Sequence, residues 1–233
     1  MYKKILAQIQ CLMVVVLILL SFEGFAFGAQ EAPEIMAPSA ILMELQRGQI
    51  LYKKNPEEKL HISSANKIMT GLIALEKMQN QLNTSITVSK KAVSVEGAVL
   101  NLEVGGKYPV EDLIYSVLLG SANDSANVLA EYIGGDEQGF VELMNKKAKE
   151  LEMKDTYFTN PTGLYDENQY TTAYDLAVLI RYAVTKSNTF NEIFSSKARP
   201  WVDGRQILIN SNELFWSYDG VDGGKTGYNE KER

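Results

Sequence analysis

A serine and a lysine three residues apart, in the stretch "SSANK", could act as a nucleophile and its base. The hydroxyl of Ser64 would react only after a base removed its proton, and a neutral Lys67 amine could do this. An apolar run begins at Ile68, so a helix starting here would put both side chains on one face and bury the lysine. Burial and a second cation would lower the lysine pKa. The alternative is a solvated surface lysine, since most lysines are exposed.

A second polar pair lies in "GSANDSAN", between two stretches with helical periodicity. Ser121 could relay a proton, and the amide of Asn123 could hold a peptide group, because alternate residues of an extended loop point the same way. Helix capping would also explain these residue types. Ser125 and Asn127 repeat the pattern and are a rival assignment for the same role.

A third group lies near the C-terminus, in the extended stretch "GGKTG". Lys225 and Thr226 are suited to bind a substrate carboxylate, and the adjacent glycines allow the backbone to approach a ligand closely.

Composition excludes several other kinds of site. The chain has 233 residues, with one histidine, His61, and one cysteine, Cys11. A Ser-His-Asp triad would have to use His61, which we interpret as a polar loop residue, and a histidine-rich zinc site is impossible. The formal charge of −6 makes nucleic acid an unexpected partner.

The N-terminal residues have the pattern of a targeting segment. Two lysines precede a short apolar run, which ends at the small residues Ala26 and Gly28. This pattern predicts a secretory signal peptide over residues 1–28 and an exported domain over 29–233. The alternative is an uncleaved anchor, which would hold the protein at a membrane surface.

Helical and extended patterns alternate along the rest of the chain. A hairpin is expected around Gly48, with further extended stretches after Pro200. Helical spacing of apolar residues predicts helices over 64–79, 110–119, 121–135, 140–151 and 172–184. Strand signals at both ends and helices between them predict a sheet made from the two termini and covered by helices.

The three motifs S-x-x-K, S-x-N and K-T-G, in this order, resemble those of penicillin-binding proteins and serine β-lactamases. The stretches "FTNPTGL" and "TTAYDLAVLIRY" are similar to the low-molecular-mass D-alanyl-D-alanine carboxypeptidases. The likeness runs from about residue 36 to the end of the chain. It implies a mixed α/β fold of the β-lactamase/transpeptidase type, with an antiparallel sheet from the two termini and a helical region, and no cofactor or metal.

The resemblance also implies a role for each motif residue. Ser64 would be the acylated nucleophile and Lys67 its general base. Ser121 would pass a proton to the departing D-alanine, Asn123 would hold the peptide and Lys67, and Lys225 would be the second cation.

The K-T-G motif would bind the end of the substrate. Thr226 would share the terminal carboxylate with Lys225, and Gly227 would let the backbone approach it. The backbone N–H groups of Ser64 and Tyr228 would form the oxyanion hole.

Two departures from the family pattern affect what we expect. Thr162 stands where the family often has a histidine. The sequence ends six residues after Gly227, whereas the family has further strands of the same sheet, a second domain and often a membrane-binding helix. We therefore expect an incomplete sheet, and a domain over 29–233 that lacks its last strands and any C-terminal domain.

The function expected from these residues is an exported serine D,D-carboxypeptidase that removes the last D-alanine of peptidoglycan stem peptides. β-Lactam antibiotics would be covalent inhibitors, and the protein would lie in the cell envelope, the periplasm or outside the cell. One alternative is a β-lactamase of related fold, although the chain has no E-x-x-L-N stretch. The other is a truncated, non-catalytic protein that binds penicillin or muropeptides.

Overall fold

The computed structural model describes residues 32–202, 204 and 206–228, together with residues 2, 5, 12 and 13 near the N-terminus. The chain divides into two units, Met1–Met36 and Ala37–Arg233, and almost all described residues belong to the second. The predicted signal peptide, residues 1–28, lies outside the continuously described stretch. No helix among the described residues has the length and apolar character needed to span a bilayer.

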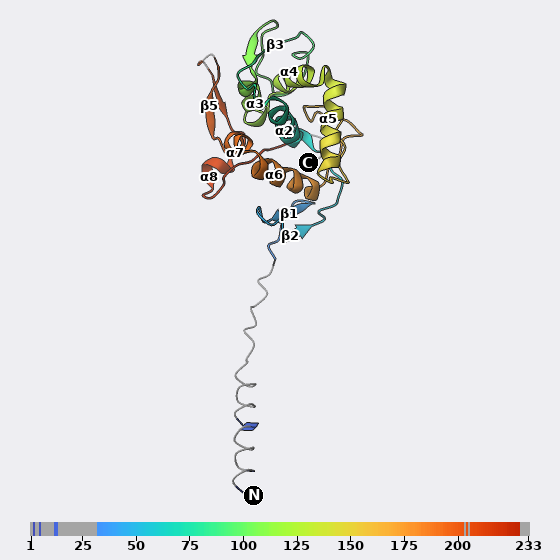
Figure 1. Cartoon of the computed structure of the whole chain (residues 1–233), viewed down its shortest axis with the longest axis vertical. Helices are drawn as coiled ribbons and strands as arrows, with labels where there is room; N and C mark the ends of the chain where they lie inside the picture. Colours follow the sequence, from blue (N-terminus) through green and yellow to red (C-terminus); the bar gives the residue numbers. More distant parts are fainter. Residues whose placement is uncertain are drawn as a thin grey trace. The chain divides into compact units, whose positions relative to one another are not determined.

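Helix α2, Lys67–Met78, lies at the centre of the helical body in Ala37–Arg233 (Figure 1). Ten of its residues are buried, because it is apolar on nearly all sides and other helices contact it all round. These helices are α3 (Val110–Leu118), α4 (Asn123–Gly134), α5 (Glu137–Glu150), α6 (Ala173–Lys186) and α7 (Asn188–Phe194). A 3₁₀ turn, η1 (Ser63–Asn66), leads directly into α2.

The described strands form three separate antiparallel pairs. The pairs are β1 (Ala40–Met43) with β2 (Ile50–Lys54), β3 (Ser85–Thr87) with β4 (Lys107–Pro109), and β5 (Ala198–Pro200) with β6 (Ile207–Ile209). A short helix, α8 (Leu214–Ser217), follows β6. Residues 221–228, which carry the K-T-G motif, form no strand, and β1 and β2 pair only with each other among the described residues. The incomplete sheet was expected, but the described residues contain only the N-terminal hairpin of the sheet predicted from the two termini.

Helix boundaries agree with the predicted breaks and caps. Helix α3 ends at Leu118 and α4 begins at Asn123, on either side of the predicted break. Ser121, between them, has a φ of +58°, which lies outside the right-handed α-helical region. At the start of α6 the Thr172 side chain accepts a hydrogen bond of 3.0 Å from the backbone N–H of Asp175, which is the predicted N-cap.

The N-terminus of α4 forms hydrogen bonds with the backbone of residues 98–102. The buried carboxylate of Asp124 accepts hydrogen bonds of 3.1 Å from the backbone N–H groups of Leu100 and Leu102. The backbone N–H of Asn123 donates to the carbonyl of Ala98 at 2.7 Å. Residues 96–102 are therefore fixed against α4.

The loop over residues 159–164 is fixed against η1 and α2 by side chains. Asn66 Nδ2 donates to the carbonyl of Asn160 at 2.7 Å, and Thr70 Oγ1 donates to the carbonyl of Pro161 at 2.6 Å. Gly163, with a φ of +77°, lies so close to Ser63 that a side chain at this position would overlap the Ser63 carbonyl oxygen. Gly163 therefore allows the loop to pack on the turn that carries Ser64.

We predict that Gly163→Ala destabilises the protein by more than the strain of its positive φ, which alone costs on the order of 1–3 kcal/mol. Gly105→Ala is the matched control, because Gly105 has a φ of +81° and nothing within 4 Å of the added methyl group. Chemical denaturation of both variants measures the difference. Equal losses in the two would contradict a close approach of Gly163 to Ser63.

Candidate active site

Ser64 lies on η1, half-buried, at the edge of a cavity of about 600 Å³. Residues from five separate stretches line this cavity. They include Ser64, Glu96, Asn123, Thr162, Asp166 and Tyr228. The hydroxyl of Ser64 has no hydrogen-bond partner among the described residues, so it is open to a group that enters the cavity.

Lys67 is the first residue of α2 and is fully buried, with 0% of its surface exposed. Its Nζ donates a hydrogen bond of 2.6 Å to the carbonyl of Thr162. Burial, and secondarily the charge of Lys225, lower the pKa of Lys67 from 10.5 to about 7. A substantial fraction of this amine is therefore neutral near pH 7, one helical turn from Ser64.

Lys225 is half-buried, and its Nζ donates to the carbonyl of Thr226 at 2.7 Å. Burial lowers the pKa of Lys225 to about 8. The charge of Lys225 lowers the pKa of Lys67, so the two amines lie near each other although they are far apart in the sequence. The structure therefore brings the S-x-x-K and K-T-G motifs together.

The rest of the K-T-G motif lies against η1. A methyl group added at Gly227 would lie 3.4 Å from the backbone nitrogens of Ser64 and Ala65. Tyr228 lines the same cavity as Ser64. Thr226 is exposed, and its hydroxyl shares a hydrogen bond of 2.8 Å with that of Ser211.

Asn123 also lines this cavity, at the first turn of α4. Its Nδ2 donates to the carbonyl of Glu96 at 2.6 Å, so the side chain is held at the cavity wall. Ser121 is half-buried and does not line the cavity. Lys67 donates to Thr162, and no hydrogen bond joins it to Asn123.

Ser125 and Asn127, the alternative pair for the second motif, do not line the cavity beside Ser64. Ser125 is fully buried, and its hydroxyl has no hydrogen-bond partner among the described residues. Asn127 donates to the carbonyl of Ala92 at 3.2 Å and lines a different cavity of about 150 Å³. Asn123, and not Asn127, shares a cavity with Ser64.

Residues 26–232 match the family described as D-alanyl-D-alanine carboxypeptidase, peptidase S11. The chain belongs to this family. It is 39% identical over 225 residues to the D-alanyl-D-alanine carboxypeptidase DacF of Bacillus subtilis, over 91% of this chain and 57% of that protein. It is 35% identical to DacD of Escherichia coli, over 88% of this chain and 55% of that protein.

Solved structures of the same kind confirm the predicted transpeptidase-like mixed α/β fold. The D-alanyl-D-alanine carboxypeptidase of Mycobacterium tuberculosis has a TM-score of 0.81 at 30% identity, over 88% of this chain and 77% of that one. Penicillin-binding protein 5 of Haemophilus influenzae has a TM-score of 0.80 at 31% identity, over 86% and 60%. The chain spans little more than half the length of the curated carboxypeptidases that it matches.

In this carboxypeptidase-family chain, sequence reasoning did not find the hydrogen-bond partner of Lys67. The sequence distinguishes Thr162 only as a departure from the family pattern, yet its backbone carbonyl accepts the hydrogen bond of the Lys67 amine. The only signal was the turn composition of "TNPTG", which predicts a loop and not its contacts. His61 also lines the cavity, with Nδ1 at 3.1 Å from the carbonyl of Gln169.

Among the described residues, no three histidine, cysteine, aspartate or glutamate side chains lie together in a way that could hold a metal ion.

We predict that burial of Lys67 makes stability depend on pH. The amine has a pKa of about 7 when folded and about 10.5 when unfolded, so the unfolded chain binds more protons between these values. Relative to Lys67→Met, the free energy of unfolding of the parent should rise from pH 7 to pH 10 by up to about 1.4 kcal/mol per pH unit. Below pH 7 the difference should be constant.

Denaturant unfolding at a series of pH values measures this difference. Lys90→Met, at an exposed lysine, is the control and should give a profile parallel to that of the parent. A constant difference between parent and Lys67→Met up to pH 10 would mean that the amine is not held neutral.

Proposed function

We propose that this chain is an exported serine D,D-carboxypeptidase, which removes the terminal D-alanine from peptidoglycan stem peptides through an acyl-enzyme on Ser64. One observation carries the proposal. A buried lysine, with its pKa lowered to about 7, begins a helix one turn after a serine that lines a 600 Å³ cavity. Membership of the carboxypeptidase family supports the reaction and the substrate.

Acylation begins at the serine hydroxyl. Neutral Lys67 takes the proton of Ser64 Oγ as that oxygen attacks the carbonyl carbon of the penultimate D-alanine. The carbonyl oxygen becomes an oxyanion, which the backbone N–H groups of Ser64 and Tyr228 stabilise. The close approach of Gly227 to the nitrogen of Ser64 supports this pairing of donors.

The tetrahedral intermediate then collapses. The carbon–nitrogen bond breaks, and the departing amine of D-alanine takes a proton that comes from Lys67, with Ser121 as the relay. Water attacks the carbonyl carbon of the Ser64 ester as Lys67 takes one of its protons. The bond from this carbon to Ser64 Oγ then breaks, Lys67 returns that proton to Ser64 Oγ, and the shortened peptide leaves with a new carboxyl group, which ionises. No cofactor takes part in these steps.

The substrate is held at both sides of the scissile bond. Lys225 and Thr226 bind the terminal carboxylate, and Asn123 binds the peptide group on the other side. Although burial lowers the pKa of Lys225 to about 8, most of this amine is still protonated at neutral pH, so it can bind an anion and also disfavour a proton on Lys67.

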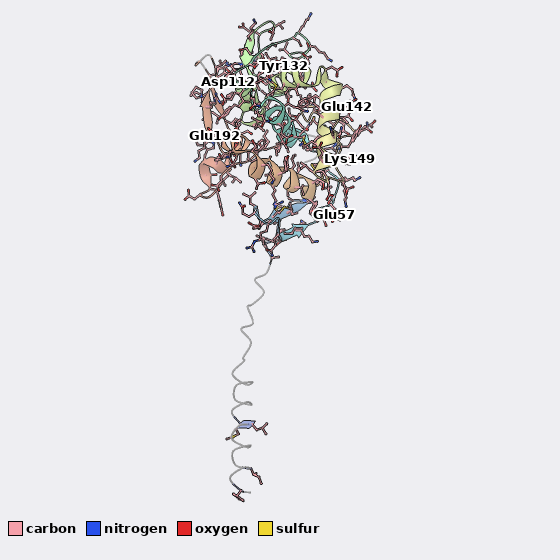
Figure 2. All side chains as sticks on the ribbon, viewed as in Figure 1. Glu57, Asp112, Tyr132, Glu142, Lys149 and Glu192 are labelled. Carbon is pink, nitrogen blue, oxygen red and sulfur yellow. The ribbon has the colours of Figure 1, made fainter. Side chains whose placement is uncertain are left out.

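The lifetime of a penicillin adduct separates this proposal from β-lactamase activity. A β-lactamase needs a base that activates water for rapid deacylation. In place of the E-x-x-L-N stretch that supplies this base in many β-lactamases, residues 142–145 read E-L-M-N. Glu142 is exposed on α5 and does not line the cavity (Figure 2). We expect a stable adduct, and rapid turnover of penicillin would favour the β-lactamase.

We predict that fluorescent penicillin labels the protein covalently at Ser64. Ser64→Ala should remove all labelling, and Lys67→Ala should slow it by about 10²–10⁴-fold while the fold is retained. Ser94→Ala, at an exposed serine outside the cavity, is the control and should label like the parent. A folded parent that takes up no label would support the non-catalytic alternative.

The pH profile of acylation should be bell-shaped. The rate should rise as Lys67 loses its proton near pH 7, and fall as Lys225 loses its charge near pH 8. In Lys225→Met the falling limb should vanish and the rising limb should move to higher pH, because the cation that lowers the pKa of Lys67 is gone. A rising limb at the same pH in Lys225→Met and in the parent would show that Lys225 does not lower the pKa of Lys67.

We predict that Asn123→Ala slows acylation by at least about tenfold, since it removes a group that orients the peptide. Asn127→Ala should change the rate by less than about twofold, because Asn127 lines another cavity. Stopped-time labelling of the two variants compares them directly. A larger loss in Asn127→Ala than in Asn123→Ala would instead assign the second motif to Ser125 and Asn127, one helical turn later.

A further inference from the structure

Residues 221–228, which carry the K-T-G motif, form no strand in the described chain. Two side-chain hydroxyls contact this segment instead. Strand pairing would normally fix the position of such a segment. Here Ser63 Oγ donates a hydrogen bond of 2.6 Å to the carbonyl of Tyr228. Farther along, the hydroxyls of Ser211 and Thr226 share a bond of 2.8 Å.

Ser63 has an unusual backbone conformation next to the nucleophile. It has a φ of +49°, which L-residues other than Asn and Gly rarely adopt, and it immediately precedes Ser64 on η1. Its Cβ would be 3.3 Å from a methyl group added at Gly227. The Ser63 side chain thus lies beside Gly227 and donates a hydrogen bond to the next residue, Tyr228. A strained residue at this place is consistent with a positioning role.

We propose that Ser63 is a positioning residue, whose hydroxyl holds Gly227 and Tyr228 beside the backbone N–H of Ser64. The inference rests on the proposed function, because it assigns the contact to the oxyanion hole of that reaction. The Ser63 hydroxyl ties the turn that carries one oxyanion donor to the residue that carries the other.

The expected effect is on the transition state and not on binding. Both N–H groups must converge on the position of the oxyanion, and a small displacement of one weakens the stabilisation strongly. Loss of the Ser63 hydroxyl should therefore lower kcat for a D-Ala-D-Ala peptide and leave KM nearly unchanged.

Ser63→Gly gives the sharpest test. It removes the hydroxyl and also relieves the positive φ, so the thermal midpoint should stay the same or rise. The rate of penicillin acylation and kcat should each fall by about tenfold. Lower activity without lower stability is a result that a merely structural role would not give.

Two further variants complete the comparison. Ser63→Ala also lacks the hydroxyl and should lose the same activity, although it keeps the backbone strain. Asn101→Gly is the matched control, since Asn101 has a φ of +58° and lies outside the cavity lining. It should gain stability and acylate like the parent.

Hydrogen exchange separates failure of this inference from failure of the proposed function. In Ser63→Gly, amides of residues 224–228 should exchange faster than in the parent, whether or not the protein is active. Unchanged exchange there, or acylation of Ser63→Gly at the parent rate, would overturn the positioning role. A parent without acylation but with the expected exchange difference would overturn only the assigned reaction.

Discussion

The burial of the Lys67 amine is the constraint on which the rest of the structure depends. A fully buried lysine without an ionised partner loses its proton more easily, because removing a charge from water costs free energy. The described residues give Lys67 a carbonyl partner and a nearby cation, and no ion pair with a carboxylate. Every neighbouring contact that keeps water from this amine therefore helps to hold it in the neutral form, which can accept a proton.

Several parts of the fold keep the amine buried at a cost in stability. Helix α2 is apolar on nearly every side. The loop over 159–164 contacts its first turn, where carbonyls of the loop accept hydrogen bonds from Lys67 and Thr70. Gly163 lets this loop approach η1 closely. The K-T-G segment brings Lys225 near Lys67, and both amines are destabilised as cations by burial. Reactivity and stability are thus opposed at this site.

Local patterns predicted most of the helices and the three motifs, since helical periodicity and caps are read from neighbouring residues. The Thr172 cap and the break before Asn123 are examples. Contacts between distant segments were not predictable in this way. The bond from Ser63 to Tyr228 spans 165 positions, and the partner of Lys67 is a backbone carbonyl, which every residue carries. Short elements such as α7 and α8 also gave too few residues for a periodic signal.

Direct titration of the Lys67 amine tests the account most directly. Nuclear magnetic resonance of protein labelled in the lysine side chains, with Lys67→Met used to assign the signal, follows the amine from pH 5 to pH 11. The account predicts a midpoint near 7 for Lys67 in the folded protein. A midpoint near the ordinary value of 10.5 would contradict it, since the amine would then be charged at neutral pH and unable to take the serine proton.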